Sequence, residues 1–207
     1  MTVTRERWAQ GLSADEYKAQ MTRNQDQFAE NERTIILDAD DVAFFQALPA
    51  PLPVLVLAED WCGDVIANLP VLLRLADESG KLDVRIFPRD QHLDLMDLYL
   101  NQGQHRSIPV FVLFDPDFRE LGHWIERPAT MTALHQQLMA SLMSEPVMAD
   151  VTPGMSPAQM PEAARTRMMQ AFGEFRASHR AQSDHEVVRD LRRIVEQGVA
   201  STDGPAA

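Results

Sequence analysis

The sequence predicts an α/β fold with a mixed central sheet flanked by helices. Through the middle of the chain, short apolar runs bounded by turn residues alternate with stretches of helical periodicity. The last two runs are joined by Asp115-Pro116-Asp117, a hairpin turn, so these two strands are antiparallel. This order is typical of an α/β layout, and we expect right-handed crossovers to place helices on both faces of the sheet.

The chain begins with an expected N-terminal helical extension, residues 1–34, of which residues 4–32 form the helical part. Ser13, followed three residues later by Glu16, has the pattern of a capping box at a helix start. A short amphipathic helix over residues 40–48 follows and is stopped by the two prolines after it.

The central domain is expected over residues 35–145. Its strands are apolar runs rich in branched residues, and its helices carry leucines at helical spacing. We expect strands at residues 53–59, 83–88, 109–114 and 119–127. We expect helices at residues 62–78, 92–101 and 130–143.

The last third of the chain predicts a linker and a pair of helices. Proline and glycine without periodicity indicate a linker at residues 146–160. A helical pair over residues 161–200 follows, and Ser183 begins a second capping box between its two members. Its expected helices are residues 161–180 and 184–199. Residues 201–207 are expected to be a disordered tail.

Composition excludes several classes of protein. A formal net charge of −12 argues against nucleic acid as a partner, because phosphate binding needs clustered Lys and Arg. The apolar runs are too short to span a bilayer, and the first residues do not form a signal peptide. One cysteine in 207 residues argues against a disulfide-stapled secreted fold. We therefore expect a cytoplasmic protein with no membrane partner.

The single cysteine lies in the most informative motif, Trp61-Cys62-Gly63-Asp64. The motif joins an apolar strand to an amphipathic helix, where backbone N–H groups and the helix dipole stabilise a thiolate. Because no second cysteine exists, no disulfide can form within the chain.

The central region resembles the thioredoxin superfamily. The resemblance rests on the motif around Cys62, on Pro70 eight residues later and on the segment Arg106-Ser107-Ile108-Pro109. It covers about residues 35–143 and implies a thioredoxin-like fold. It also implies a cis bond before Pro109 that presents the backbone of the preceding residue beside the sulfur. In detail the chain is similar to a bacterial subgroup with a Trp-Cys-Gly-Asp motif, a single active-site cysteine and no firmly assigned activity.

Two departures from the family separate this chain from ordinary thioredoxins. Val65 stands where the family has its second, resolving cysteine, and Val56 stands where it has a buried acid. Since the acid assists proton transfer from the resolving thiol, the joint loss is chemically coherent. A single chain therefore cannot carry out the usual dithiol–disulfide cycle.

The sequence leaves the state of Cys62 open. Its place at a helix start favours a thiolate, whereas Glu59, Asp60 and Asp64 oppose one unless they point away or pair with Arg89 or Arg106. The alternative is a small apolar cysteine that packs in the core.

For a reactive Cys62, a monothiol path is the simplest chemistry. Cys62 would be the catalytic nucleophile on mixed disulfides of proteins or small molecules, with a low-molecular-weight thiol as co-substrate and no other cofactor. The expected substrate-binding residues are Trp61, Gly63, Asp64, Arg106, Ile108 and Pro109. Asp64 is either a proton acceptor or a residue that stabilises the helix N-terminus. His105 and Arg106 either bind carboxylates of a small thiol or form a solvated loop.

The histidines and the C-terminal methionines give weaker signals about function. The histidines show no metal-ligand spacing, so no metal site is expected, and an iron–sulfur cluster shared between two copies does not fit the motif. The methionine-rich C-terminal helices suggest packing or a homodimer. The competing function is a non-catalytic thioredoxin-like protein-binding module.

Overall fold

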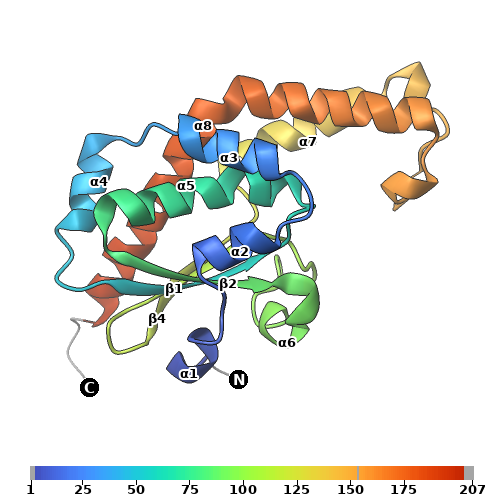
Figure 1. Cartoon of the computed structure of the whole chain (residues 1–207). Helices are drawn as coiled ribbons and strands as arrows, with labels where there is room; N and C mark the ends of the chain where they lie inside the picture. Colours follow the sequence, from blue (N-terminus) through green and yellow to red (C-terminus); the bar gives the residue numbers. More distant parts are fainter. Residues whose placement is uncertain (1–2, 153, 203–207) are drawn as a thin grey trace. The chain divides into compact units, whose positions relative to one another are not determined.

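The computed structural model describes residues 3–152 and 154–202 of the chain (Figure 1). These residues form a mixed sheet with helices packed on it. The strands are β1 (Leu52–Ala58), β2 (Leu82–Pro88), β3 (Val110–Phe114) and β4 (Glu120–Ile125). Each lies within one residue of its expected start and within two of its expected end, because apolar runs bounded by turns define strands well.

The sheet has the order β2-β1-β3-β4. β1 runs parallel to β2 and antiparallel to β3, and β3 and β4 form an antiparallel hairpin. The hairpin turn is closed by the Phe118 N–H, which donates to the Asp115 carbonyl at 2.9 Å. All seven residues of β1 are buried, as expected for a central strand covered on both faces.

Helix α5 (Gly63–Ser79) connects the parallel strands β1 and β2. It starts directly after Cys62, whose backbone is extended, and it ends at Gly80, whose φ of 63° is the left-handed conformation that glycine adopts readily. Helices α3 and α4 lie against α5 on the same side of the sheet (Figure 1). The helix that follows the cysteine motif is therefore packed between the sheet and these two helices, while residues of its last turns, such as Asp77, remain exposed.

The N-terminal extension consists of three short helices, whereas the sequence suggested one nearly continuous helical stretch. They are α1 (Arg5–Trp8), α2 (Ala14–Gln20) and α3 (Gln25–Thr34). The capping box of Ser13 and Glu16 is present at the start of α2. The first break brings Gly11 so close to Phe87 that a Cβ there would lie 2.6 Å from the ring, so only glycine fits this approach.

Of the next two helices, one agrees with its predicted bounds and the other is much shorter than predicted. Helix α4 (Ala39–Gln46) follows its prediction closely, but α6 (Leu93–Met96) is much shorter than the expected residues 92–101. A 3-10 turn, Arg89–Gln91, precedes α6. The chain turns after α6, and Asn101 pairs with His105 as an isolated bridge, so residues 97–101 lie outside the helix.

Contacts divide the chain into two compact units. One comprises the residues up to Arg127 together with those from Ser183 onwards, and the other is Pro128–Gln182. The second unit contains α7 (Ala129–Met143), the 3-10 turns Pro146–Met148 and Pro157–Gln159, and the first part of α8. Its own small core is formed by Leu142, Met148, Val151, Ala164 and Ala171.

The expected C-terminal helical pair is a single helix, α8 (Glu162–Thr202). The pair was predicted from the capping pattern at Ser183, but no proline or glycine stands there, so the helix continues through it. Ser201 and Thr202 belong to this helix, and the rest of the expected tail lies outside the described residues.

The last part of α8 completes the core of the first unit. Trp124 of β4 stacks on Phe111 and donates its indole N–H to Asp190 of α8 at 3.1 Å. The buried residues of this part of α8 are Val187, Val188, Leu191 and Val195. The sequence predicts that residues 130–143 form the final helix of the central domain. In the structure, the last part of α8 packs in this core instead.

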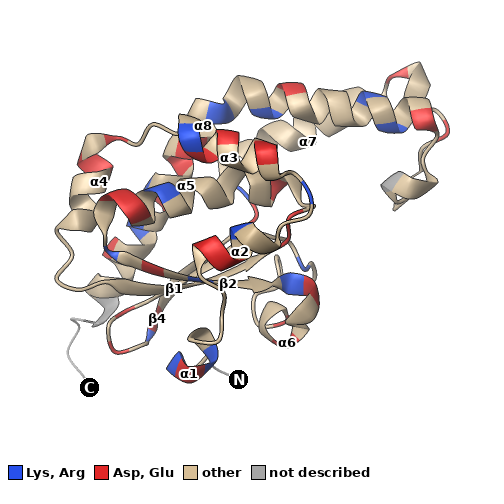
Figure 2. Ribbon diagram, in the orientation of Figure 1, with Lys and Arg blue, Asp and Glu red and all other residues tan. Residues whose placement is uncertain are grey.

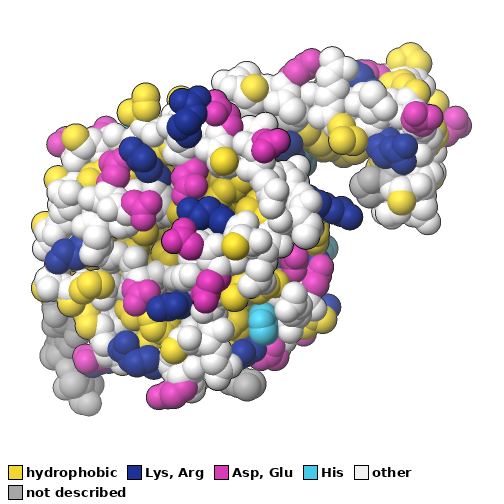
Figure 3. All heavy atoms as spheres, viewed as in Figure 1, with side chains coloured by type: hydrophobic (Ala, Val, Ile, Leu, Met, Phe, Trp, Pro, Cys, Tyr) yellow, Lys and Arg dark blue, Asp and Glu magenta, His cyan; other side chains and the backbone are white. Residues whose placement is uncertain are grey.

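Charged residues of both signs occur along most helices (Figure 2). On the face seen in Figure 3, acidic and basic side chains are interspersed rather than gathered by sign. No helix in the described part of the chain is both long enough and apolar enough to cross a bilayer.

Candidate functional site

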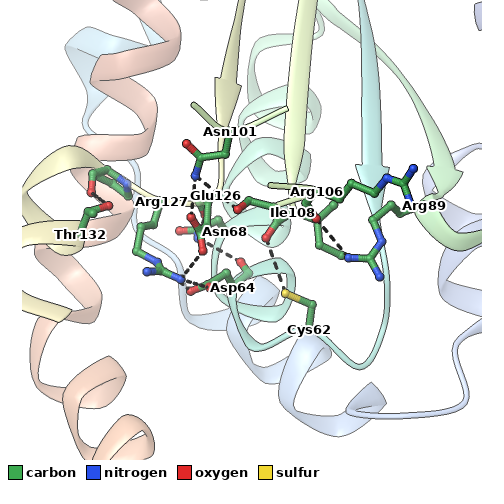
Figure 4. Close-up of polar contacts among 12 residues, drawn as sticks. Cys62, Asp64, Asn68, Arg89, Asn101, Arg106, Ile108, Glu126, Arg127 and Thr132 are labelled. Atoms are coloured by element: carbon green, nitrogen blue, oxygen red, sulfur yellow. Dashed lines mark hydrogen bonds and ion pairs between the residues drawn. The ribbon is translucent and has the colours of Figure 1, made fainter. Parts of the chain in front are cut away.

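Cys62 lies between the end of β1 and the first turn of α5, where it is the N-cap residue. Its side chain is partly buried, and its Sγ atom lies 3.6 Å from the carbonyl oxygen of Ile108 (Figure 4). The Ile108–Pro109 peptide bond is cis, as the family resemblance implied. The structure therefore brings together the cysteine motif and the proline segment, which are 46 residues apart in the chain.

The environment of Cys62 favours the neutral thiol. Burial raises the pKa of the Cys62 thiol, and the carboxylates of Asp64 and Glu126 act in the same direction. The N–H groups of Val65 and Asp64 in the first helical turn favour the thiolate, but they do not reverse the shift. These influences together oppose the thiolate that the position of Cys62 at a helix start favours.

Asp64 is held by an arginine that sequence reasoning missed. The Arg127 guanidinium contacts the Asp64 carboxylate at 2.5 Å and the Glu126 carboxylate at 2.7 Å. The second carboxylate oxygen of Glu126 accepts a hydrogen bond from Asn101 at 3.0 Å. Because these carboxylates are already bonded, Asp64 is not a free proton acceptor beside the sulfur (Figure 4).

The buried side-chain amide of Asn68 binds backbone atoms of two residues of this network. Asn68 donates to the backbone oxygens of Asp64 and Glu126 at 3.0 and 3.1 Å, and it is only 2% exposed. It thereby ties the first turn of α5 to the end of the β3–β4 hairpin. No local sequence signal pairs Asn68 with Glu126, because the two residues are 58 positions apart.

The carboxylate of Asp60 fastens the cysteine loop to the N-terminal extension. One of its oxygens accepts hydrogen bonds from the Thr22 N–H at 2.6 Å, the Thr22 hydroxyl at 3.1 Å and the Arg23 N–H at 3.0 Å. Asn24 donates to the Asp60 carbonyl at 2.8 Å. Although burial acts in the opposite direction, these N–H groups lower the pKa of Asp60.

The carboxylate of Glu59 has a different partner from that of Asp60: it accepts a hydrogen bond from the Asp90 N–H at 2.7 Å. Desolvation raises the pKa of Glu59, although this hydrogen bond acts against the shift. The three acids that the sequence places beside Cys62 thus have separate partners. None of these hydrogen-bond partners is the side chain of Arg89 or Arg106, but the charge of Arg89 opposes the rise in the pKa of Glu59.

Those two arginines shape the rim of the site instead. Arg89 lies over the ring of Trp61, 4.9 Å from its centroid, and donates to the backbone oxygen of Arg106 at 3.1 Å. Arg106 forms a two-pronged pair with Asp97 at 2.7 and 2.9 Å. Trp61 is 44% exposed, so it offers an apolar surface next to Cys62.

An open pocket of about 740 Å³ lies along the segment that leads to Ile108. It is lined by Asp97, Leu100, Gln104, His105, Arg106 and Ser107. The sequence leaves His105 and Arg106 either as ligands for the carboxylates of a small thiol or as part of a solvated loop, and both line this pocket. The pair with Asp97 uses Nε and one terminal nitrogen of Arg106, so the N–H groups of the other terminal nitrogen are left for an anionic ligand.

Tyr17 of α2 is a further residue that the sequence did not single out for chemistry. Its side chain is 4% exposed, and its hydroxyl has no hydrogen-bond partner among the described residues. Burial raises the pKa of Tyr17, and the charges of Asp60, Glu59 and Cys62 add to this shift. The extension therefore places a buried hydroxyl within electrostatic range of the cysteine.

Comparison with known proteins decides the family. A family model described as Thioredoxin matches residues 11–139, more than half of the chain. The chain belongs to the thioredoxin family. No curated protein matches it.

Two solved structures share the thioredoxin-like fold. A protein of unknown function from Pseudomonas aeruginosa, PA1234, has a TM-score of 0.65 at 16% identity, over 94% of this chain and 98% of that one. An HIV epitope scaffold has a TM-score of 0.58 at 16% identity, over 91% of this chain and 94% of that one. At this identity the likeness shows the fold alone. The coverage nevertheless extends beyond the thioredoxin core that the family model matches.

Proposed function

We propose that this thioredoxin-family protein is a monothiol thiol–disulfide oxidoreductase that acts through Cys62. The observation that supports the proposal is the position of the Cys62 sulfur. Cys62 is partly buried, and its sulfur faces the backbone oxygen of Ile108, beside an apolar surface formed by Trp61. Gly63 and Pro109 complete the proposed binding surface, since they form the two backbone segments that flank the sulfur.

The proposed reaction needs only one protein thiol. The Cys62 thiol loses its proton to solvent, and its sulfur attacks one sulfur of a mixed disulfide between a substrate and a small thiol. The substrate sulfur leaves as a thiolate and takes up a proton, while the small thiol becomes bound to Cys62 as a disulfide. A second small thiol then attacks this disulfide, which returns the Cys62 thiol and releases an oxidised small-thiol dimer.

The raised pKa of Cys62 suits this role in one respect. A thiol that is neutral at rest reacts slowly with oxidants and alkylating agents that do not bind the site. Its sulfur is also intrinsically more nucleophilic once deprotonated, because nucleophilicity rises with pKa. Selectivity then depends on binding at the rim, where we propose that Arg106 and the adjacent pocket receive the small thiol.

The test is the reduction of a glutathionylated or bacillithiolated model peptide in the presence of the corresponding small thiol. The wild-type protein should accelerate release of the free peptide, and Cys62→Ser should not. Asp77→Asn, a change at an exposed acid of α5 with no hydrogen bond among the described residues, serves as the matched control and should match wild type. Equal rates for wild type and Cys62→Ser would leave no catalytic role for the thiol.

A second candidate function is a non-catalytic binding module that uses the same surface around Cys62 and Pro109, together with the C-terminal helix. The raised pKa of Cys62 favours it, as does the absence of a second cysteine. In that case Cys62→Ser would bind the partner as tightly as wild type does.

We further propose that the partners are disulfide-bearing proteins or small molecules in the cytoplasm, and that a homodimer would use the C-terminal helix.

A further inference from the structure

Three side chains with metal-ligating atoms meet at the start of helix α4. They are Asp38, Asp41 and His185, whose ligand atoms all lie within 4.8 Å of one another. Asp38 is the N-cap of α4, and Asp41 lies in its first turn, which is rich in acidic residues (Figure 2). His185 comes from the part of α8 that belongs to the same compact unit.

We propose that these three residues form a binding site for a divalent transition-metal ion such as Zn²⁺. One imidazole nitrogen with two carboxylate oxygens is a donor set that zinc accepts, and three protein ligands leave a fourth position for water. Ligand atoms around tetrahedral zinc lie about 3.4 Å apart, given bonds of about 2.1 Å. The exposed side chain of Asp38 has the freedom to close the remaining distance.

The charge balance of the cluster supports a cation. The Asp41 side chain is 7% exposed, and its compensation is Arg192, whose guanidinium lies 3.1 Å from one carboxylate oxygen and also binds Glu196. The carboxylate of Asp38 has no cationic partner among the described residues. Because Arg192 is divided between Asp41 and Glu196 and does not reach Asp38, the cluster retains uncompensated negative charge.

The imidazole of His185 is the independent observation that points to a metal. The described part of the chain offers it no hydrogen bond or ion pair, although it is partly buried beside two carboxylates. Histidine is the commonest metal ligand, and carboxylates alone favour harder ions such as Mg²⁺. Spacing in the sequence did not reveal this site, because its ligands come from segments far apart in the chain.

A metal ion bound here would join α4 to α8. The same part of α8 supplies Val187 and Leu191 to the core of the first unit, so the ion would fix a helix on which that core depends. The expected role is structural. The inference does not rest on the proposed chemistry of Cys62.

The experiment is calorimetric titration of the full chain with Zn²⁺, in the Cys62→Ser background to remove a competing thiolate ligand. We expect one ion per chain and a rise in the thermal unfolding midpoint on its addition. Asp38→Asn, which keeps a good helix cap, and His185→Gln should each raise the Kd by more than about tenfold, the loss that even an outer-shell change can cause. His179→Gln, on the same helix, is the control and should bind as the parent does.

Two results would overturn the site. One is no saturable Zn²⁺ binding by the parent, and the other is unchanged binding by both Asp38→Asn and His185→Gln. If the variants fold poorly, NMR of the parent decides: Co²⁺ should broaden the ring signals of His185 before those of the other five histidines. Simultaneous broadening of all six would also reject the site.

Discussion

The contact between Asp60 and the N-terminal extension gives the sharpest prediction about stability. Replacement of Asp60 by Asn removes the charge on an oxygen that accepts three hydrogen bonds, from two groups of Thr22 and from the Arg23 N–H. A hydrogen bond to a charged acceptor is worth about 1 kcal/mol more than one to a neutral amide oxygen, and partial exposure reduces the sum over the three bonds. We expect the free energy of unfolding to fall by about 1–3 kcal/mol.

Two assays check this prediction. Urea unfolding gives the change in free energy, and hydrogen exchange of the Thr22 and Arg23 amides reports on the contact itself. The control is Asp77→Asn, because the Asp77 side chain is exposed and has no hydrogen bond among the described residues. This change should alter the free energy of unfolding by less than about 0.5 kcal/mol. If both amides keep wild-type protection in Asp60→Asn, the carboxylate does not hold the extension.

The effect of Asp60 should also depend on pH. Because the folded state lowers the pKa of Asp60, its contribution is present above the unfolded value of about 3.9 and is lost as pH falls through the folded value. The difference between wild type and Asp60→Asn should therefore be full at pH 7 and shrink below about pH 4. A difference that grows as the pH falls would contradict this assignment.

The remaining predictions concern the thiol and α8. Glu126→Gln should lower the pKa of Cys62 and Arg127→Gln should raise it, which the pH dependence of the iodoacetamide reaction measures; equal midpoints would show that these charges do not act on the sulfur. Gly198→Ala should cost about 1–3 kcal/mol in urea unfolding, because its Cβ would lie 2.7 Å from a β4 side chain, whereas Gly173→Ala on the same helix should gain up to about 1 kcal/mol. Equal effects of the two alanines would refute the close packing of α8.

The sheet and the cysteine motif could be predicted because their signals are local. Apolar runs give the four strands, and the junction around Cys62 with the segment before Pro109 gives the family. The C-terminal region was harder. The capping pattern at Ser183 is local as well, but a helix without a breaker continues through it when its next turns, including Leu191, are buried in a core.

The polar surroundings of the cysteine could not be predicted from local patterns. Asp64 binds Arg127, 63 residues away, and Asp60 binds the loop that starts at Thr22, 38 residues away. Of the three acids near Cys62 in the sequence that were expected to oppose a thiolate, Asp64 raises the pKa of Cys62 in the structure. The structure adds Glu126, which only the fold brings within range of the sulfur.

Trapping of the covalent intermediate tests the central claim most directly. Wild-type protein is mixed with a glutathionylated peptide in the absence of free small thiol, quenched with acid, and analysed by intact mass and peptide mapping. The proposed chemistry predicts a glutathione adduct on Cys62 that forms as the free peptide appears. Release of the peptide no faster than in buffer, with Cys62 unmodified throughout, would contradict it.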